Sequence, residues 1–164
     1  MVYRSALAIV PALALAACGQ SAEAPAPVEQ PAAVDVAAVT WTSVSSGEGS
    51  ALAAQDAAGN VVLNLACLYA PERMRITVPG FNAIGSEERL SFGADDEPFV
   101  FVAQLQEAGP GVAAEREVSL DLVERLGRAE TVAANYGAQN VGPFPAPPTD
   151  QVAAFATVCR EIAG

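Results

Sequence analysis

The sequence contains no histidine and no lysine, and these two absences narrow its chemistry more than any motif does. Without histidine, the chain cannot form a Ser-His-Asp or Cys-His arrangement, a histidine general base or a His-containing zinc site. Without lysine, Ser-Lys nucleophiles and Schiff-base chemistry are excluded as well. Carboxylates, tyrosine and arginine remain, but no acidic pair has a spacing that marks a glycosidase. We therefore expect no catalytic residue, no metal site and no cofactor, in a protein that is not an enzyme.

Basic residues are scarce. Eight arginines stand against 19 acidic residues, which gives a formal net charge of −11. Nucleic-acid phosphates need clustered positive charge, so we expect no nucleic-acid partner. The same acidity disfavours electrostatic docking on anionic lipid headgroups. Any attachment to a membrane must therefore come from acyl chains and not from basic residues.

The N-terminal stretch has the layout of an export signal. Arg4 provides a positive start, residues 6–14 form a short apolar run, and Leu15-Ala16-Ala17-Cys18 closes it with small residues and a thiol. The run is shorter than the roughly 20 apolar residues that a membrane-spanning helix needs. Cleavage by an ordinary signal peptidase, at an Ala-x-Ala site within residues 12–16, is the alternative interpretation.

This layout resembles the signal of bacterial lipoproteins, whose lipobox ends in the lipidated cysteine. The resemblance implies that residues 1–17 are removed and that acyl chains on Cys18 anchor the protein in a membrane of the cell envelope. Gly19 stands where lipoproteins kept in the inner membrane commonly have Asp, which favours the outer membrane, facing the periplasm. Two or more acyl chains are enough for stable anchoring.

The other two cysteines form an even pair if Cys18 carries lipid. Cys67 and Cys159 then predict one disulfide in an oxidising compartment. It would close a loop of about 93 residues, worth roughly 4.6 kcal/mol in the chain-entropy model. Two buried free thiols are the alternative.

Composition divides the mature chain into a tether and a domain. Residues 18–38 are rich in Ala, Pro and Glu without a periodic apolar face, which predicts an extended spacer. The folded domain is expected to span residues 39–164, with an α+β fold: a small antiparallel sheet or sandwich, with two helices in the C-terminal half.

Alternating apolar residues and turn signals place the strands of this domain. The clearest strand is 61–67, in which Cys67 lies on the core face. The stretch 142–148 contains four prolines and is expected to be irregular. The expected strands are 40–45, 51–56, 61–67, 74–78, 88–92, 99–105 and 130–136.

Two helices are expected near the C-terminus. Ser119 is predicted to cap a helix that runs to about Arg128, and Thr149 to cap the last helix. In the last helix, apolar residues recur every three or four positions from Val152 to Ile162, so Cys159 falls on its buried face. We therefore expect a disulfide between a strand and the last helix.

Three groups of residues are candidate sites, each with a simpler interpretation. The acidic run at 95–97 offers oxygens for Ca²⁺ but lacks an EF-hand spacing, so a solvated hairpin tip is favoured. Arg73 and Arg75 share a strand face and could hold a partner's carboxylate, although pairing with the chain's own acids is simpler. Loop aromatics could anchor a partner or plug the core. These aromatics are Tyr69, Phe81 and Phe144.

The order of motifs in the domain is also similar to that of small exported proteins of the invasion-associated locus B and VasI kind. The resemblance rests on residues 65–67, 74–78, 122–126 and 155–159. It implies a β-rich domain with a strand-to-helix disulfide and an accessory role in the envelope. The resemblance implies no catalytic residue in this chain.

These observations lead to one expected function and two alternatives. We expect a lipid-anchored envelope protein that binds another envelope protein or a small ligand without catalysing a reaction. A carboxylate-dependent hydrolase of envelope polysaccharide and a purely structural lipoprotein are the alternatives.

Overall fold

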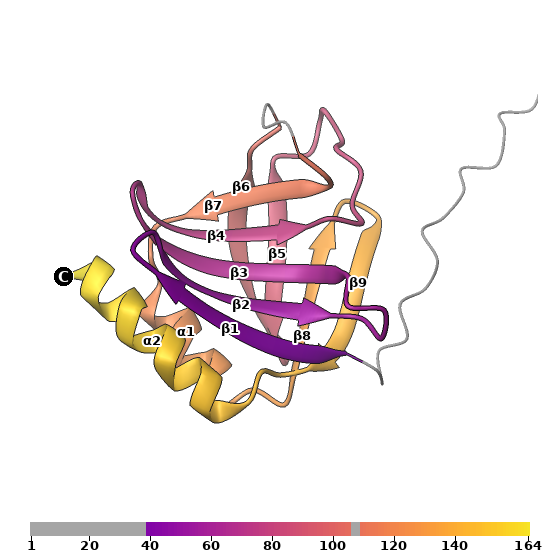
Figure 1. Cartoon of the computed structure of the whole chain (residues 1–164). Coiled ribbons are helices and arrows are strands. Elements are labelled where there is room, and N and C mark those ends of the chain that lie inside the picture. The colour runs from indigo at the N-terminus through magenta and orange to yellow at the C-terminus, as the bar shows by residue number, and fades with distance from the viewer. Residues whose placement is uncertain (1–38, 106–108) are drawn as a thin grey trace, which may run out of the picture. The chain divides into compact units, whose positions relative to one another are not determined.

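The computed structural model describes residues 39–105 and 109–164 (Figure 1). These residues form a small antiparallel α+β domain of nine strands and two helices. The strands are β1 (Thr40–Ser46), β2 (Gly49–Gln55), β3 (Val61–Tyr69), β4 (Glu72–Val78), β5 (Arg89–Ala94), β6 (Glu97–Ala103), β7 (Val112–Arg116), β8 (Thr131–Tyr136) and β9 (Gln139–Pro145). The helices are α1 (Leu120–Leu126) and α2 (Thr149–Ala163).

All nine strands belong to one sheet in the order β1-β2-β3-β4-β7-β6-β5-β8-β9, and every pair is antiparallel. The predicted fold class is therefore confirmed, as a single sheet. The chain departs from sequential order twice, because β7 pairs with β4 and β8 pairs with β5. The crossover of β7 to lie between β4 and β6 brings β4 within two strands of β6 and three of β5.

Three local expectations were wrong or incomplete. The proline-rich stretch is not irregular, because most of it forms the edge strand β9. Strand β7 was not expected at all. Thr149 is the first residue of α2 and makes no capping hydrogen bond, and Pro148 precedes it. The capping role of Ser119 is confirmed, because its side chain accepts a hydrogen bond from the backbone N–H of Leu122 at 3.2 Å.

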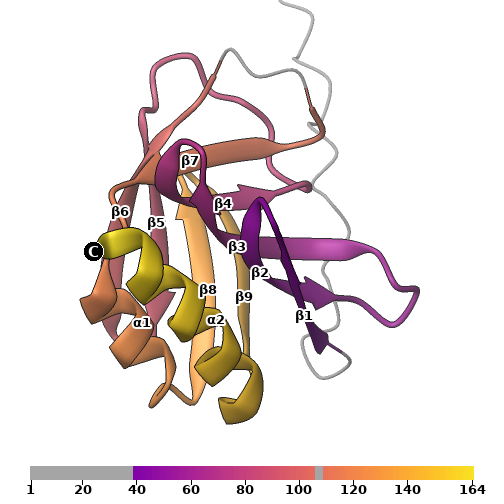
Figure 2. The same cartoon turned by 60° about the vertical axis from the view of Figure 1, so that its left-hand side comes forward.

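The sheet curls around the core, so that β1 to β4 and β7 lie across from β5, β6, β8 and β9 (Figures 1 and 2). Trp41 joins the two edge strands, because its indole N–H donates to the carbonyl oxygen of Pro145 on β9 at 2.8 Å. The side chain of Gln151, in the first turn of α2, donates to the Trp41 carbonyl at 3.1 Å. The largest fully buried side chains between the two halves include Phe92, Phe101, Tyr136, Phe144 and Phe155.

Helix α2 packs against α1 and against β1 to β4, beneath the curled sheet (Figure 2). Its buried positions are Val152, Phe155, Ala156, Cys159 and Ile162, the face that the sequence predicts. No helix among the described residues has the length and apolar character needed to cross a membrane.

Candidate binding face on the sheet

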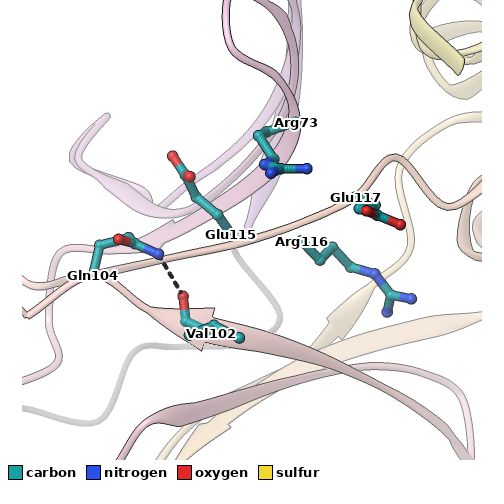
Figure 3. Close-up of a pocket in the computed structure, with 6 residues that line it drawn as sticks. All are labelled: Arg73, Val102, Gln104, Glu115, Arg116 and Glu117. Carbon is teal, nitrogen blue, oxygen red and sulfur yellow. Dashed lines mark hydrogen bonds between the residues drawn. The ribbon is translucent and has the colours of Figure 1, made fainter.

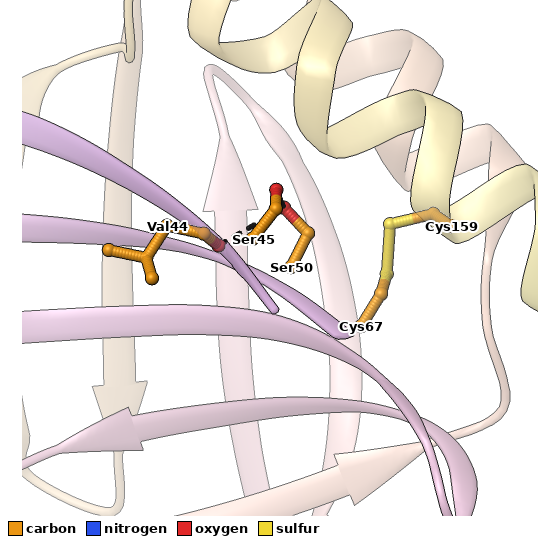
Figure 4. The surroundings of a disulfide bond; sticks show 5 residues. All are labelled: Val44, Ser45, Ser50, Cys67 and Cys159. Carbon is orange, nitrogen blue, oxygen red and sulfur yellow. Dashed lines mark hydrogen bonds between the residues drawn. A yellow bond between two sulfur atoms is a disulfide. The ribbon is translucent and has the colours of Figure 1, made fainter. Parts of the chain in front are cut away.

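The cysteine pair lies where the sequence predicts it. Cys67 on β3 and Cys159 on α2 form a disulfide with a Cα–Cα distance of 5.4 Å, and neither residue is exposed (Figure 4). Ser50, opposite Cys67 in the sheet, is also buried, and its hydroxyl lies 3.0 Å from that of Ser45. The bridge is therefore a structural link. Cys18 and the tether at 18–38 lie outside the described residues.

The acidic run at 95–97 forms the tip of the β5–β6 hairpin, as expected, but it is not simply solvated. The Asp95 carboxylate accepts hydrogen bonds from the backbone N–H groups of Glu130 and Thr131, both at 3.0 Å. Arg125 of α1 lies 3.7 Å from Asp95 and 3.6 Å from Glu97. The run thus joins the hairpin to α1 and β8. In the described part of the chain, no cluster of three or more His, Cys, Asp or Glu residues could hold a metal ion.

The three aromatics predicted in loops contact other parts of the fold, and two of them, Tyr69 and Phe144, lie in strands β3 and β9 instead of loops. Phe144 and Phe81 are buried in the core, and Phe81 stacks on Tyr136 with the ring centres 6.3 Å apart. Tyr69 is half-exposed at the end of β3, where its hydroxyl donates to Glu161 of α2 at 2.8 Å. This hydrogen bond raises the pKa of Tyr69 above its ordinary value of 10.0.

Arg73 and Arg75 lie on the outer face of β4, on either side of the buried Met74, as predicted. They differ in their contacts. Arg75 pairs with Glu115 of β7 at 3.6 Å, which agrees with the simpler interpretation. Arg73 is exposed and has no carboxylate within 4.0 Å among the described residues. One of the two arginines therefore remains available to a partner.

Arg73 is not alone in lacking an ion pair. Seven of the eight arginines fall in the described part of the chain. Within it, ion pairs form at Arg75, Arg125 and Arg128. The four described arginines without one are Arg73, Arg89, Arg116 and Arg160. In a chain with 19 acidic residues, four described arginines thus lack a carboxylate within 4.0 Å in the described part.

Strand register places one of these arginines, Arg89, beside an exposed apolar ridge. Arg75, Glu115, Val102 and Arg89 lie opposite one another in a single row across β4, β7, β6 and β5. Val102 is 57% exposed, and Val100, two residues earlier on the same face, is 48% exposed. We call this outer surface of β4, β7, β6 and β5 the arginine–valine face.

Two open hollows lie on this face, one on each side of the valine ridge. The first has a volume of about 340 Å³ and is lined by Arg73, Val102, Gln104, Glu115, Arg116 and Glu117 (Figure 3). The second has a volume of about 220 Å³ and is lined by Glu87, Arg89, Ser91, Val100, Asn135 and Gly137. Each hollow thus has one valine of the ridge and at least one unpaired arginine in its wall.

Arg116 is held by aromatic rings instead of a carboxylate. Its guanidinium carbon lies 5.5 Å from the ring centre of Phe101 and 5.8 Å from that of Phe99. Cation–π contact of this kind fixes the side chain without neutralising its charge. Arg116 therefore contributes a positioned positive charge to the edge of the first hollow.

Sequence reasoning found Arg73 and Arg75 but missed the other members of the face. Glu115 lies on the strand that was not predicted, and Arg89 reaches the row only through the crossover of β7. Val100 and Val102 were predicted to lie in a strand. Their position beside arginines depends on the order of the strands in the sheet, which the residue pattern within one strand does not predict.

Comparison with protein-family models, with curated proteins and with solved structures found no match to this chain.

Proposed function

We propose that the protein is a lipid-anchored envelope protein whose domain binds another envelope component through the arginine–valine face. The observation that carries the binding role is the exposed Val100–Val102 ridge between two hollows with unpaired arginines. Protein-binding surfaces are enriched in arginine and are apolar at their centre. This face has both properties in a chain that is otherwise strongly acidic.

The location rests on the lipobox at Leu15-Ala16-Ala17-Cys18. In this proposal Cys18 carries the acyl chains, residues 19–38 hold the domain away from the membrane, and Gly19 directs the protein to the outer membrane. The buried Cys67–Cys159 bridge supports the periplasm as its compartment, because structural disulfides persist where the surroundings are oxidising.

The proposed role is accessory and non-enzymatic. It draws on the resemblance to small exported proteins of the invasion-associated locus B and VasI kind, whose implied strand-to-helix disulfide is present between β3 and α2. Both hollows of the face are open to solvent and bounded by charged residues, which suits contact with a partner's surface.

The anchor can be tested with Cys18→Ala. This variant should lose labelling by radioactive palmitate and leave the membrane fraction, because the thiol that accepts the diacylglyceryl group is gone. The matched control is the Cys67→Ala/Cys159→Ala double variant, which keeps Cys18 and should still be labelled. Labelling of the Cys18→Ala variant would refute the lipoprotein assignment.

The binding face can be tested in intact cells by placing a photo-crosslinking amino acid at Val102. We expect a discrete adduct with an envelope component. The control position is Ala154, which is exposed on α2, away from the face. No adduct at Val102, or the same adduct from Ala154, would contradict the binding role of the face.

A further inference from the structure

Arg73 and Arg89 are placed on the arginine–valine face as two separated, unneutralised charges. Arg73 lies on β4 and Arg89 on β5, and both side chains are exposed on the outer side of the sheet. Val102 on β6 stands directly opposite Arg89 in the strand register, and Arg73 lies on β4 two residues from Arg75, the β4 member of the same row. A ligand that crosses the strands from β4 to β5 therefore meets a positive charge, an apolar ridge and a second positive charge.

The neighbouring carboxylates do not neutralise these two arginines. Glu115 is engaged by Arg75 at 3.6 Å. Glu87 accepts a hydrogen bond from the backbone N–H of Arg89 at 2.9 Å and makes no ion pair with its guanidinium. A guanidinium without a carboxylate keeps the planar donor fork that binds a partner's carboxylate in a bidentate way.

The separation of the arginines sets the spacing of complementary groups. Along the curled sheet, three strand-to-strand steps separate β4 from β5, about 14 Å at about 4.8 Å per step, and Arg73 lies two residues, about 7 Å, along β4 from the row that contains Arg89. In an extended peptide, residues i, i+2 and i+4 point to the same side, and i to i+4 span about 13 Å. The diagonal from Arg73 to Arg89 is then about 16 Å, about 3 Å more than this span, which the length of two arginine side chains can cover. An acidic residue at i and at i+4 would therefore reach the two arginines, with an apolar residue at i+2 on the valine ridge.

We propose that the arginine–valine face binds an extended, acidic polypeptide segment of the pattern acid–x–apolar–x–acid. The inference rests on the proposed function and specifies the chemistry of its partner. Because the chain has a net charge of −11, long-range electrostatics oppose an acidic partner, so recognition depends on the local arginines. Glu117, which lines the first hollow, acts against the ligand.

The test uses the purified full-length chain and the peptide Glu-Ser-Val-Ser-Glu with capped ends, followed by NMR of the backbone amides. Saturable shifts are expected on β4, β7, β6 and β5 and not on α2. The isosteric peptide Gln-Ser-Val-Ser-Gln should bind several-fold more weakly, because it keeps the shape and loses both charges.

Single variants of the chain assign the effect to the two arginines. Arg73→Gln and Arg89→Gln should each weaken binding about three- to fivefold, the range of a solvent-exposed ion pair. Arg160→Gln is the matched control, since Arg160 is another exposed arginine without an ion pair but lies on α2. Glu117→Gln should tighten binding.

Three results would overturn the inference: no saturable shift at millimolar peptide, equal binding of the two peptides, or equal effects of Arg73→Gln and Arg160→Gln. Crosslinking from Val102 distinguishes an error in the acidic-peptide inference from an error in the proposed binding function. If the Val102 adduct forms and persists in an Arg73→Gln/Arg89→Gln background, the face binds a partner of different chemistry. If no adduct forms, the binding function itself is wrong.

Discussion

At the scale of single residues, Asp95 has the densest set of contacts among the charged side chains of the β5–β6 turn. It has a positive φ of 52°, a backbone conformation that asparagine and aspartate tolerate better than most residues. Its carboxylate accepts from two backbone N–H groups and lies beside Arg125. The turn therefore depends on this residue for both its backbone and its polar contacts.

Asp95→Ala is expected to lower the melting temperature by several degrees, and Asp95→Asn by less. Alanine loses the acceptor and adopts the positive φ poorly, whereas asparagine retains one oxygen and tolerates that conformation. Thermal unfolding followed by circular dichroism measures both. Asp96→Ala, at the neighbouring exposed turn position, is the control and should have little effect. Equal losses at the two positions would contradict the role given to Asp95.

The contribution of Asp95 should also depend on pH. The backbone N–H of Thr131, with help from that of Glu130 and from Arg125, holds the pKa of Asp95 below its ordinary value of 3.8. A carboxyl whose folded-state pKa is lowered stabilises the fold above its unfolded pKa and loses that effect as the pH falls through the folded value. The difference in melting temperature between the wild type and Asp95→Asn should thus be constant above about pH 5 and shrink below pH 4. A difference that grows on acidification would refute this account.

At the scale of elements, the strands that the sequence predicted share one property. Except in β1, where Ser43 and Ser45 follow Trp41, their inward positions are apolar, as in β3, where Leu63, Leu65 and Cys67 face the core. The two strands that were missed break this pattern for different physical reasons. In β7 the position that pairs with the buried Met74 is Arg116, whose guanidinium lies over two phenylalanine rings at the edge of the first hollow. In β9 the prolines are tolerated because the strand lies at the edge of the sheet and needs fewer backbone donors.

Strand β9 requires glycine at position 142. This residue has a φ of +90°, next to the irregularity in the β8–β9 register. A Cβ atom there would lie 2.8 Å from the carbonyl oxygen of Val132 and 3.1 Å from the backbone nitrogen of Phe144, and backbone atoms cannot move aside cheaply. Glycine is therefore required for β9 to pair with β8 across the proline-rich stretch.

Gly142→Ala is expected to destabilise the domain by about 2 kcal/mol or more, through both the strained φ and the contact with Val132. Urea unfolding followed by Trp41 fluorescence is a suitable measurement, because this single tryptophan bonds to β9. The control is Gly80→Ala, where a Cβ meets nothing within 4 Å. If the two variants have equal stability, β9 does not have the described backbone.

At the scale of the whole molecule, the binding face shows why sequence reasoning found only part of the candidate site. Arg73 and Arg75 are two residues apart on one strand, so their common face follows from the period of a strand. Arg89 and Val102 join them only because β7 inserts between β4 and β6. That insertion is a long-range pairing, set by the packing of the whole sheet and not by the residues of any one strand.

The disulfide is the other long-range feature, and here the sequence was sufficient because only two partners remained after Cys18 was assigned to lipid. Cys67 and Cys159 are 92 residues apart, and both are fully buried. A crosslink that closes so long a loop restricts the unfolded chain strongly. Its burial also shields it from reductants while the domain is folded.

Replacing both cysteines with alanine should lower the free energy of unfolding by about 2–5 kcal/mol, measured by urea denaturation. Cys18→Ala is the control, because in the proposed organisation it lies in the tether and should leave the unfolding midpoint unchanged. The same variant should show no titratable thiol in its native state. Two titratable thiols in the native Cys18→Ala variant, or an unchanged unfolding midpoint in the double variant, would contradict the Cys67–Cys159 disulfide. In the proposed organisation lipid labelling depends on Cys18 and stability on the other pair, so the two variants together assign each cysteine one role.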